Sequence, residues 1–149
     1  MKLTEATGKQ FADLPGAGAA GGMGAAVLAY LNAELKCGVD IVIESVDLAK
    51  QIEGADLVIT GEGKIDHQTA FGKTLMGVSI TAKKQGIPVI AVAGMLAPGS
   101  EVVHELGIDA VFSIIPGVTS LEKALGDAEM NMFRTARNIA MCLRLGQGI

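Results

Sequence analysis

A short polar segment contains the side chains of this chain that are best suited to chemistry. After the apolar run at residues 57–59, the sequence continues Thr60-Gly61-Glu62-Gly63-Lys64-Ile65-Asp66-His67-Gln68, and Lys73 follows. Carboxylates such as Glu62 and Asp66 can bind Mg²⁺, directly or through water, or accept a proton from a hydroxyl group. Lysines such as Lys64 and Lys73 can neutralise phosphate charge. The segment therefore suits phosphoryl transfer, and a solvated loop without function is the alternative.

The same segment does not contain a P-loop. Gly72-Lys73-Thr74 precedes a helical pattern, but the first glycine of the P-loop motif is absent. The stretch from Gly61 to Gly72 is also longer than that motif allows. Walker-type nucleotide binding is therefore excluded.

The apolar run before the polar segment explains why its residues would gather at a site. Leu57-Val58-Ile59 predicts a strand buried on both faces, which is typical of a parallel sheet. We expect this strand to stop at Thr60 and a turn to follow from Thr60 to Gly63. Ligands of open α/β sheets bind outside the carboxyl ends of the strands. The turn is therefore expected to lie at a cleft.

A glycine-rich run at residues 16–24 precedes a predicted helix that extends to about Leu35. The run contains Gly-x-Gly-x-x-Gly, but the dinucleotide motif requires a strand immediately before it, and residues 11–15 make a poor strand. Three interpretations remain open. They are a nicotinamide or flavin site, close packing of a helix start against another backbone, and a cradle of backbone amides for an anion.

The remaining elements alternate between strand and helix. We expect strands at 39–44, 88–94 and 110–115, and helices at 46–53, from 73 to about 85, at 98–106, and from about 121 to 143. Thr119 and Glu122 have capping-box spacing at the start of the last helix. This order predicts an α/β fold, a parallel Rossmann-like sheet with helices on both faces, preceded by part of a second α/β domain. We place the two domains at residues 1–50 and 51–149.

Composition excludes several classes of protein. The net charge of −4 argues against a nucleic-acid partner, because phosphate binding needs clustered Lys and Arg. No apolar run reaches the roughly 18–20 residues that cross a bilayer, and no signal-peptide pattern opens the chain. Cys37 and Cys142 have no metal-binding spacing. We therefore expect a cytoplasmic protein that binds neither nucleic acid nor membrane.

Several segments resemble the bacterial glycerate kinase family (type 1), in order and over nearly the whole chain. They lie at residues 15–26, 55–63, 65–69, 72–73, 86–94 and 107–114. The resemblance implies an enzyme that phosphorylates D-glycerate from ATP with Mg²⁺ and gives a phosphoglycerate, commonly the 2-phospho isomer. It also implies two α/β domains, one Rossmann-like and one inserted into it.

Family members are more than twice as long as this chain. Their N-terminal part carries Asp-Ser-Phe-Lys-Gly and Asp-Gly-Gly-Glu-Gly segments that belong to the active cleft, and neither segment occurs here. The chain thus resembles the C-terminal portion, namely the end of the inserted domain and the closing half of the Rossmann-like domain. A truncated chain, a split gene and a mis-started reading frame all remain open.

We predict that Glu62 and Asp66 act in catalysis, and the same two carboxylates are the predicted Mg²⁺ ligands. The predicted substrate or phosphate contacts are Gly16, Gly18, Gly21, Gly22, Thr60, Gly61, Gly63, Lys64, Gln68 and Lys73. We expect the chain alone to be inactive, to need a separate N-terminal half, and to form a homo-oligomer through an unpaired sheet edge. The alternative is a non-catalytic α/β module that binds a small anion or another subunit.

Overall fold

The computed structural model describes residues 5, 6, 8, 10, 11, 13–31, 33–67, 69 and 73–147, without the side chains of Lys73 and Gln147. The chain divides into two compact units, Met1–Ile41 and Val42–Ile149, and each is described by itself. The predicted division into domains at residues 50 and 51 stays a prediction.

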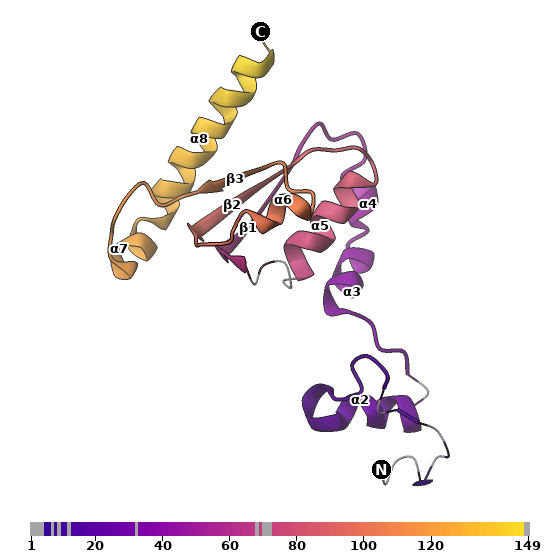
Figure 1. Ribbon diagram of the computed structural model, residues 1–149. Helices are drawn as coiled ribbons and strands as arrows, with labels where there is room; N and C mark the ends of the chain where they lie inside the picture. Colours follow the sequence, from indigo (N-terminus) through magenta and orange to yellow (C-terminus); the bar gives the residue numbers. More distant parts are fainter. Residues whose placement is uncertain are drawn as a thin grey trace. The chain divides into compact units, whose positions relative to one another are not determined.

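The first unit contains helix α2, Ala19–Tyr30 (Figure 1). Three residues at its start, Ala20 to Gly22, have positive φ angles, so the regular helix begins only at Met23. A backbone hydrogen bond of 3.0 Å from the Leu31 N–H to the Val27 carbonyl closes its last turn. The helix predicted after the glycine run is therefore confirmed, although it ends before Leu35.

The strand predicted at residues 39–44 is wrong, because this segment forms helix α3, Gly38–Ser45. Its β-branched residues favour a strand, but a strand needs a neighbouring strand to satisfy its backbone groups. A helix satisfies them internally, as in the 3.2 Å bond from the Ile41 N–H to the Cys37 carbonyl. Propensity is a weak prior, and the short helix α4, Leu48–Gln51, follows.

The second unit is built on a parallel sheet of three strands in the order β1-β2-β3 (Figure 1). The strands are β1, Val58–Ile65, β2, Val89–Leu96, and β3, Ala110–Ser113. The connecting helices are α5, Lys73–Lys83, and α6, Val102–Glu105. The predicted parallel α/β arrangement is confirmed.

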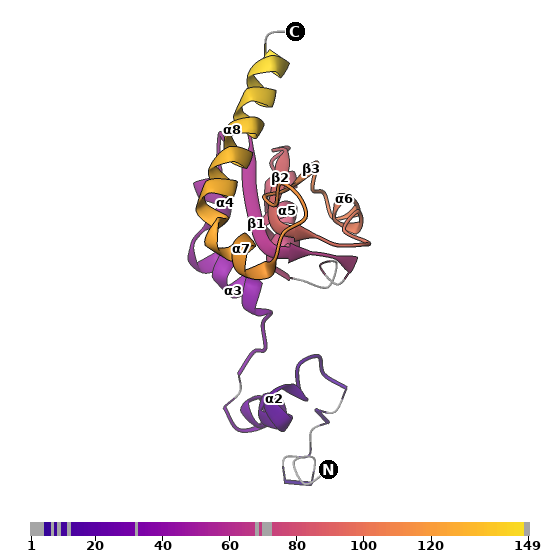
Figure 2. The same ribbon diagram turned by 90° about the vertical axis from the view of Figure 1, so that its left-hand side faces the viewer.

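Helices cover both faces of the sheet, as predicted, and Figure 2 shows α6 and α8, Ala128–Gln147, on opposite sides of the strands. On one face, alternate β2 residues pack with α5 and α6 in a cluster that includes Val89, Ala91, Ala93, Leu75, Ala82 and Val103. On the other face, Ile90 and Val92 of β2 pack with Ile139 of α8. We call these the closed face and the open face.

The two longer strands differ in burial. β2 is buried on both faces from Val89 to Ala93, as a central parallel strand should be. β1 lies at the edge of the described sheet, and its residue Ile59 is 56% exposed. The prediction that residues 57–59 are buried on both faces is therefore wrong, because too little chain covers this edge.

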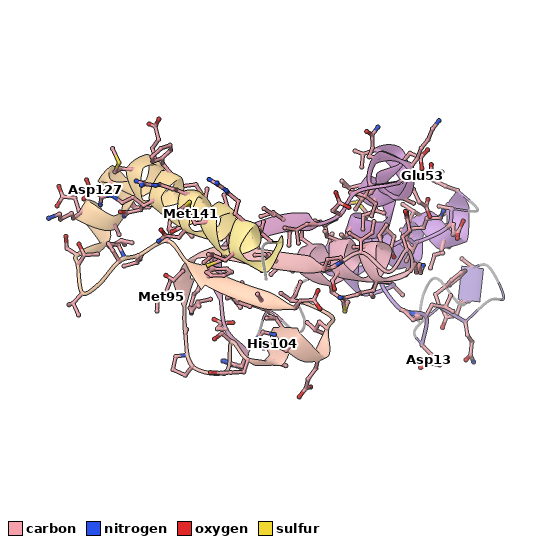
Figure 3. The ribbon with its side chains drawn as sticks, turned by 90° about the horizontal axis from the view of Figure 1, so that it is seen from above. Asp13, Glu53, Met95, His104, Asp127 and Met141 are labelled. Atoms are coloured by element: carbon pink, nitrogen blue, oxygen red, sulfur yellow. The ribbon has the colours of Figure 1, made fainter. Side chains whose placement is uncertain are left out.

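The last helical region consists of two helices, not one. Helix α7, Leu121–Gly126, and α8 meet at Asp127, which is labelled in Figure 3. The N-cap of α7 is Ser120 and not Thr119, since the Ser120 hydroxyl accepts a 3.3 Å hydrogen bond from the Lys123 N–H. In the part of the chain that the structure describes, no helix is both long and apolar enough to cross a membrane.

Glycines end the helices of the second unit where the sequence predicts it. After α5 and after α6, Gly86 and Gly107 have positive φ angles. The next residue in each case, Ile87 or Ile108, is buried and donates its N–H to a carbonyl five residues earlier, at 3.1 Å. This hydrogen bond and the buried side chain are typical of a Schellman motif, which turns the chain into the following strand.

Candidate functional site

The first half of the polar segment is a strand and not a turn. The prediction that the strand stops at Thr60 is wrong, because β1 continues to Ile65. Thr60 pairs with Ala91, and Glu62 pairs with Ala93, so both side chains lie on the closed face. Glu62 is half-buried there. Its carboxylate is therefore placed by a strand, which is more rigid than a loop.

Glycines allow β1 and β2 to approach closely in this stretch. A Cβ on Gly61 would lie 2.6 Å from the carbonyl oxygen of Val92. A Cβ on Gly94 would lie 2.5 Å from the carbonyl oxygen of Gly63. Real side chains essentially never approach so closely, so strand pairing alone accounts for Gly61. A role for Gly61 and Gly63 in binding phosphate stays a prediction.

The carboxyl end of β1 carries an ion pair. Lys64 Nζ lies 2.7 Å from Asp66 Oδ2, and the side chains are 54% and 15% exposed, respectively. The preceding residue, Ile65, is completely buried and anchors the strand end. The structure thus brings together two of the predicted site residues, one acidic and one basic, at the edge of the sheet where ligands bind.

A tight turn fixes the position of Asp66. Its N–H donates to Thr69 Oγ1 at 3.0 Å, and the Thr69 N–H donates to the Asp66 carbonyl at 2.9 Å. Thr69 is only 5% exposed, so this hydroxyl is part of the structure. Sequence reasoning missed its role, although a threonine three residues after an aspartate is a usual signal for such a local bond.

The loop after β2 packs against this turn. The Ala97 N–H donates to the Ile65 carbonyl at 2.9 Å. A Cβ on Gly99 would lie 2.9 Å from Cβ of His67, so the two loops are in close contact. The acidic residue at the end of β1 is therefore supported by a second loop from the same edge of the sheet.

The two predicted Mg²⁺ ligands are not neighbours along the strand. Glu62 and Asp66 are four residues apart in extended chain, which separates their Cα atoms by about 13 Å. Among the residues that the structure describes, no three His, Cys, Asp or Glu side chains gather as a metal site. Mg²⁺ in kinase sites is held by one or two carboxylates together with substrate phosphates. A single carboxylate such as Asp66 is sufficient for that arrangement.

A hollow of about 480 Å³ borders the glycine-rich part of β1 on the open face. Its lining consists of Ile59, Thr60, Gly61, Glu62, Gly63, Val92 and Met132. Met132 belongs to α8, so this helix forms one wall. The edge of β1 and the apolar side chains Ile59 and Met132 are accessible here.

The glycine run of the first unit is tightly packed at two residues. A Cβ on Gly16 would lie 3.1 Å from Leu35 Cδ1. The tighter contact is at Gly24, which sequence reasoning did not select. A Cβ on Gly24 would overlap the carbonyl oxygen of Gly16, and the Ala25 N–H donates to the Ala17 carbonyl at 2.9 Å. A Cβ on Gly18, Gly21 or Gly22 would meet nothing within 4 Å. Close packing thus explains Gly24, and an anion cradle at the other glycines stays a prediction.

Two predicted contacts lie outside what the structure describes. Gln68 falls outside the described residues, and Lys73 begins α5 without a described side chain. Their roles as phosphate contacts stay predictions.

The amino end of the sheet has a different polar network. Lys83 Nζ, from α5, lies 2.6 Å from Asp109 Oδ2, and the same oxygen accepts a 2.6 Å hydrogen bond from the Val89 N–H. The hydrogen bond from Lys83, followed by that from Val89, lowers the pKa of the Asp109 carboxyl below its ordinary value. This network joins the end of a helix to the starts of two strands, so we assign it a structural role.

Comparisons with known proteins agree on one family. The model of the glycerate kinase family matches residues 1–144. A glycerate kinase of Bacillus subtilis (strain 168) is 51% identical over 143 residues, which are 96% of this chain and 37% of that protein. A glycerate 2-kinase of Escherichia coli (strain K12) is 51% identical over 134 residues, which are 90% of this chain and 35% of that protein.

A solved structure supports the same grouping. The crystal structure of a Salmonella typhimurium LT2 protein, provisionally named glycerate kinase 2, superposes with a TM-score of 0.77 at 44% identity. The match covers 99% of this chain and 37% of that one. The chain therefore spans a little over a third of the length of the relatives that it matches.

Proposed function

Because the chain belongs to the glycerate kinase family, we propose that it supplies the C-terminal part of an enzyme that phosphorylates D-glycerate from ATP. The observation that carries this proposal is the family match over residues 1–144. The Lys64–Asp66 pair lies at the carboxyl end of β1, where ligands of such sheets bind, and it supplies charged groups suited to this reaction. The name of the Escherichia coli relative favours the 2-hydroxyl group as the acceptor and 2-phosphoglycerate as the product.

The ion pair suggests how the acidic residue becomes available. Lys64 and Asp66 neutralise each other in the structure. A bound phosphate group would compete for the Lys64 ammonium, and Asp66 could then accept the proton of the attacking hydroxyl. That hydroxyl oxygen forms a bond to the γ-phosphorus while the bond from the γ-phosphorus to the ADP oxygen breaks. Asp66 is fixed for this role by its turn with Thr69.

Mg²⁺ would enter with ATP and supply neutralisation of the phosphate charge. Its ligands would be phosphate oxygens together with Asp66 or Glu62, which agrees with the small number of carboxylates available here. Which of the two carboxylates binds the metal and which accepts the proton can be separated by mutation.

We further propose that turnover needs the part of the family fold that this chain does not include. Catalysis of phosphoryl transfer depends on positioning and on charges that converge on both substrates. The described residues provide one charged edge of a sheet, and the chain spans only about 37% of its Bacillus subtilis relative. The groups on the other side of the cleft must then come from the remaining family sequence.

A coupled assay tests both statements. The purified 149-residue chain should show no ADP release that depends on D-glycerate and Mg²⁺-ATP. ADP release that depends on both substrates should appear when the polypeptide that corresponds to the rest of the family fold is added. Turnover by the chain alone would refute the need for that part, whereas an assembled protein that binds phosphate without turnover would support the non-catalytic alternative.

Substitutions in the assembled enzyme test the two carboxylates. Loss of a positioned proton acceptor typically costs about 10²- to 10⁴-fold in rate. We expect such a loss in Asp66→Asn. Whichever of Asp66→Asn and Glu62→Gln removes the metal ligand should need a higher Mg²⁺ concentration for half-maximal rate. Glu129→Gln, on the exposed side of α8, is the control. Wild-type kinetics in both site variants would refute the assignment.

A further inference from the structure

A second hollow lies beyond the carboxyl end of β3. It has a volume of about 290 Å³ and is formed by the loop after β3, by α7 and by the first turns of α8. Its lining consists of Pro116, Gly117, Val118, Thr119, Lys123, Ala124, Asp127, Asn131 and Arg134. The volume is at the lower limit for small-molecule pockets, so it suits a small ligand. Because the strands are parallel, the hollow lies at the same edge of the sheet as Asp66.

The wall of this hollow contains a polar side chain that has no protein partner among the described residues. Asn131 is only 4% exposed. Within the part of the chain that the structure describes, its side-chain amide makes no hydrogen bond, and neither of its polar atoms is completely enclosed. The amide thus reaches solvent at the hollow that it lines. Buried amides are normally hydrogen-bonded, since leaving one without a partner costs free energy. A ligand in the hollow would replace this solvent as the hydrogen-bond partner of the amide.

The charges around Asn131 indicate the chemistry of that ligand. Lys123 and Arg134 line the hollow, and neither forms an ion pair with any residue of the described chain. Among the described lining residues, Asp127, labelled in Figure 3 at the junction of α7 and α8, is the one acidic residue. Two cations and one anion leave a positive site that can hold a carboxylate. A carboxylate side chain and an amide in the same wall can bind hydroxyl groups.

We propose that this hollow binds a small hydroxy acid, and, on the basis of the proposed function, that this acid is the D-glycerate acceptor. Lys123 and Arg134 bind its carboxylate. Asp127 and Asn131 bind the hydroxyl group that is not phosphorylated, the amide oxygen or nitrogen of Asn131 acting as acceptor or donor. The charged edge at Lys64 and Asp66 is then left for the reacting hydroxyl group and for the phosphate that it attacks.

Nuclear magnetic resonance of the purified chain tests the proposal directly and needs no turnover. The side-chain NH₂ signals of Asn131 are assigned by their loss in Asn131→Leu. They should shift in a saturable way when D-glycerate is added up to tens of millimolar. D-lactate, which keeps one hydroxyl, should bind more weakly, and propionate, which has none, more weakly still. Absence of a shift with D-glycerate would overturn the proposal, as would equal binding of propionate. Tighter binding of inorganic phosphate than of D-glycerate would overturn it in favour of a phosphate site.

Variants separate binding from folding. Lys123→Gln and Arg134→Gln should each weaken D-glycerate binding by about tenfold, because each removes a charged hydrogen-bond donor. Arg137→Gln is the matched control on α8, outside the lining, and should bind normally. Asn131→Leu should weaken binding while the melting temperature stays equal or rises, since it removes a buried amide without a partner. A fall in melting temperature with unchanged binding would assign Asn131 to the fold and overturn its role.

Kinetics of the assembled enzyme distinguish this proposal from the general function. Arg134→Gln should raise the KM for D-glycerate and leave the KM for ATP unchanged. A raised KM for ATP alone would overturn the assignment of the hollow to the acceptor, although the enzyme would still be a glycerate kinase. Absence of turnover in the wild-type assembly would refute the proposed function. The nuclear magnetic resonance titrations would then decide by themselves whether the hollow binds a hydroxy acid.

Discussion

The two faces of the sheet are packed to different degrees. Among the described residues, ten form one buried cluster on the closed face, and the side chain of Leu75 is completely inaccessible. On the open face, the buried cluster of described residues consists of Ile90, Val92 and Ile139. Large apolar side chains of α7 and α8 remain accessible, such as Phe133 at 65% and Leu125 at 68%. The closed face resembles the interior of a complete domain, and the open face does not.

This difference indicates where the remaining family sequence would pack. Monomeric proteins rarely expose large contiguous apolar patches, and such patches usually mark an interface. The open face also includes the edge of β1, where backbone groups can pair with a further strand. We infer that in a complete glycerate kinase this face is covered. The following predictions test the contrast between the two faces and the elements that maintain it.

The largest effect should be on assembly. The isolated chain should form a dimer or larger species through the open face, and Ile59→Lys should return it to a monomer, because a lysine at a strand edge prevents pairing. Ile80→Lys, at a similarly exposed site on α5, is the control and should not change the assembly. Sedimentation velocity measures both. A monomeric wild-type chain would contradict the prediction.

The next effect, on the free energy of unfolding, compares one leucine on the closed face with one on the helices of the open face. Leu75→Ala on the closed face should lower the free energy of unfolding by about 2–5 kcal/mol, because it leaves a cavity. Leu125→Ala, at a residue 68% exposed, should cost less than about 0.5 kcal/mol. Urea unfolding measures the difference. Equal losses of unfolding free energy in the two variants would show that α7 is well packed in the isolated chain. The proposed difference in packing between the closed and open faces would then be wrong.

A smaller effect is expected from the glycines of β1. Gly61→Ala should destabilise by about 1–3 kcal/mol, since its Cβ would meet the Val92 carbonyl oxygen. Gly63→Ala meets nothing within 4 Å and should change stability by less than about 1 kcal/mol. Thermal unfolding distinguishes these outcomes. If Gly61→Ala unfolds like the wild type but loses phosphate binding in the assembled enzyme, Gly61 serves the site and not the strand pairing.

The smallest effect belongs to Asp109. Its pKa is lowered in the folded state, so its contribution is present above the unfolded pKa of about 3.9 and is lost as the pH falls through the folded pKa. Asp109→Asn keeps an acceptor for the Val89 N–H but removes the charge. This substitution should lower the free energy of unfolding by less than about 1 kcal/mol at pH 7, because the Lys83–Asp109 pair is partly solvated. The cost should disappear at strongly acidic pH, and a constant difference between pH 7 and pH 2 would contradict this account.

The elements that sequence predicts best are those with local signals. The continuous run before Gly94 predicts β2, and Gly86 and Gly107 end their helices where expected. The segment at 39–44 shows the limit, since its β-branched residues favour a strand and only the supply of pairing partners decides against it. Likewise, the apolar run at residues 57–59 predicts a strand buried on both faces, but burial depends on which other segments cover the strand.

The site is predictable in its residue types more than in its geometry. The charged residues after the apolar run predict a site near Asp66, and the structure adds the bond to Thr69 that fixes it. The close approach at Gly61 depends on the carbonyl of Val92, some thirty residues away, which no local pattern reveals. Asn131 was missed because its burial without a partner is a property of tertiary packing alone.

The polar network at the amino end of the sheet bears on how the chain folds. It connects Lys83, Val89 and Asp109, and its longest connection spans only 26 residues. Contacts between residues so close in sequence require little loop-closure entropy and are associated with fast folding. The segment from α5 to β3 can therefore acquire its native pairing during synthesis, soon after residue 109 leaves the ribosome. It would then offer β2 as a template to which the glycine-rich strand β1 is added.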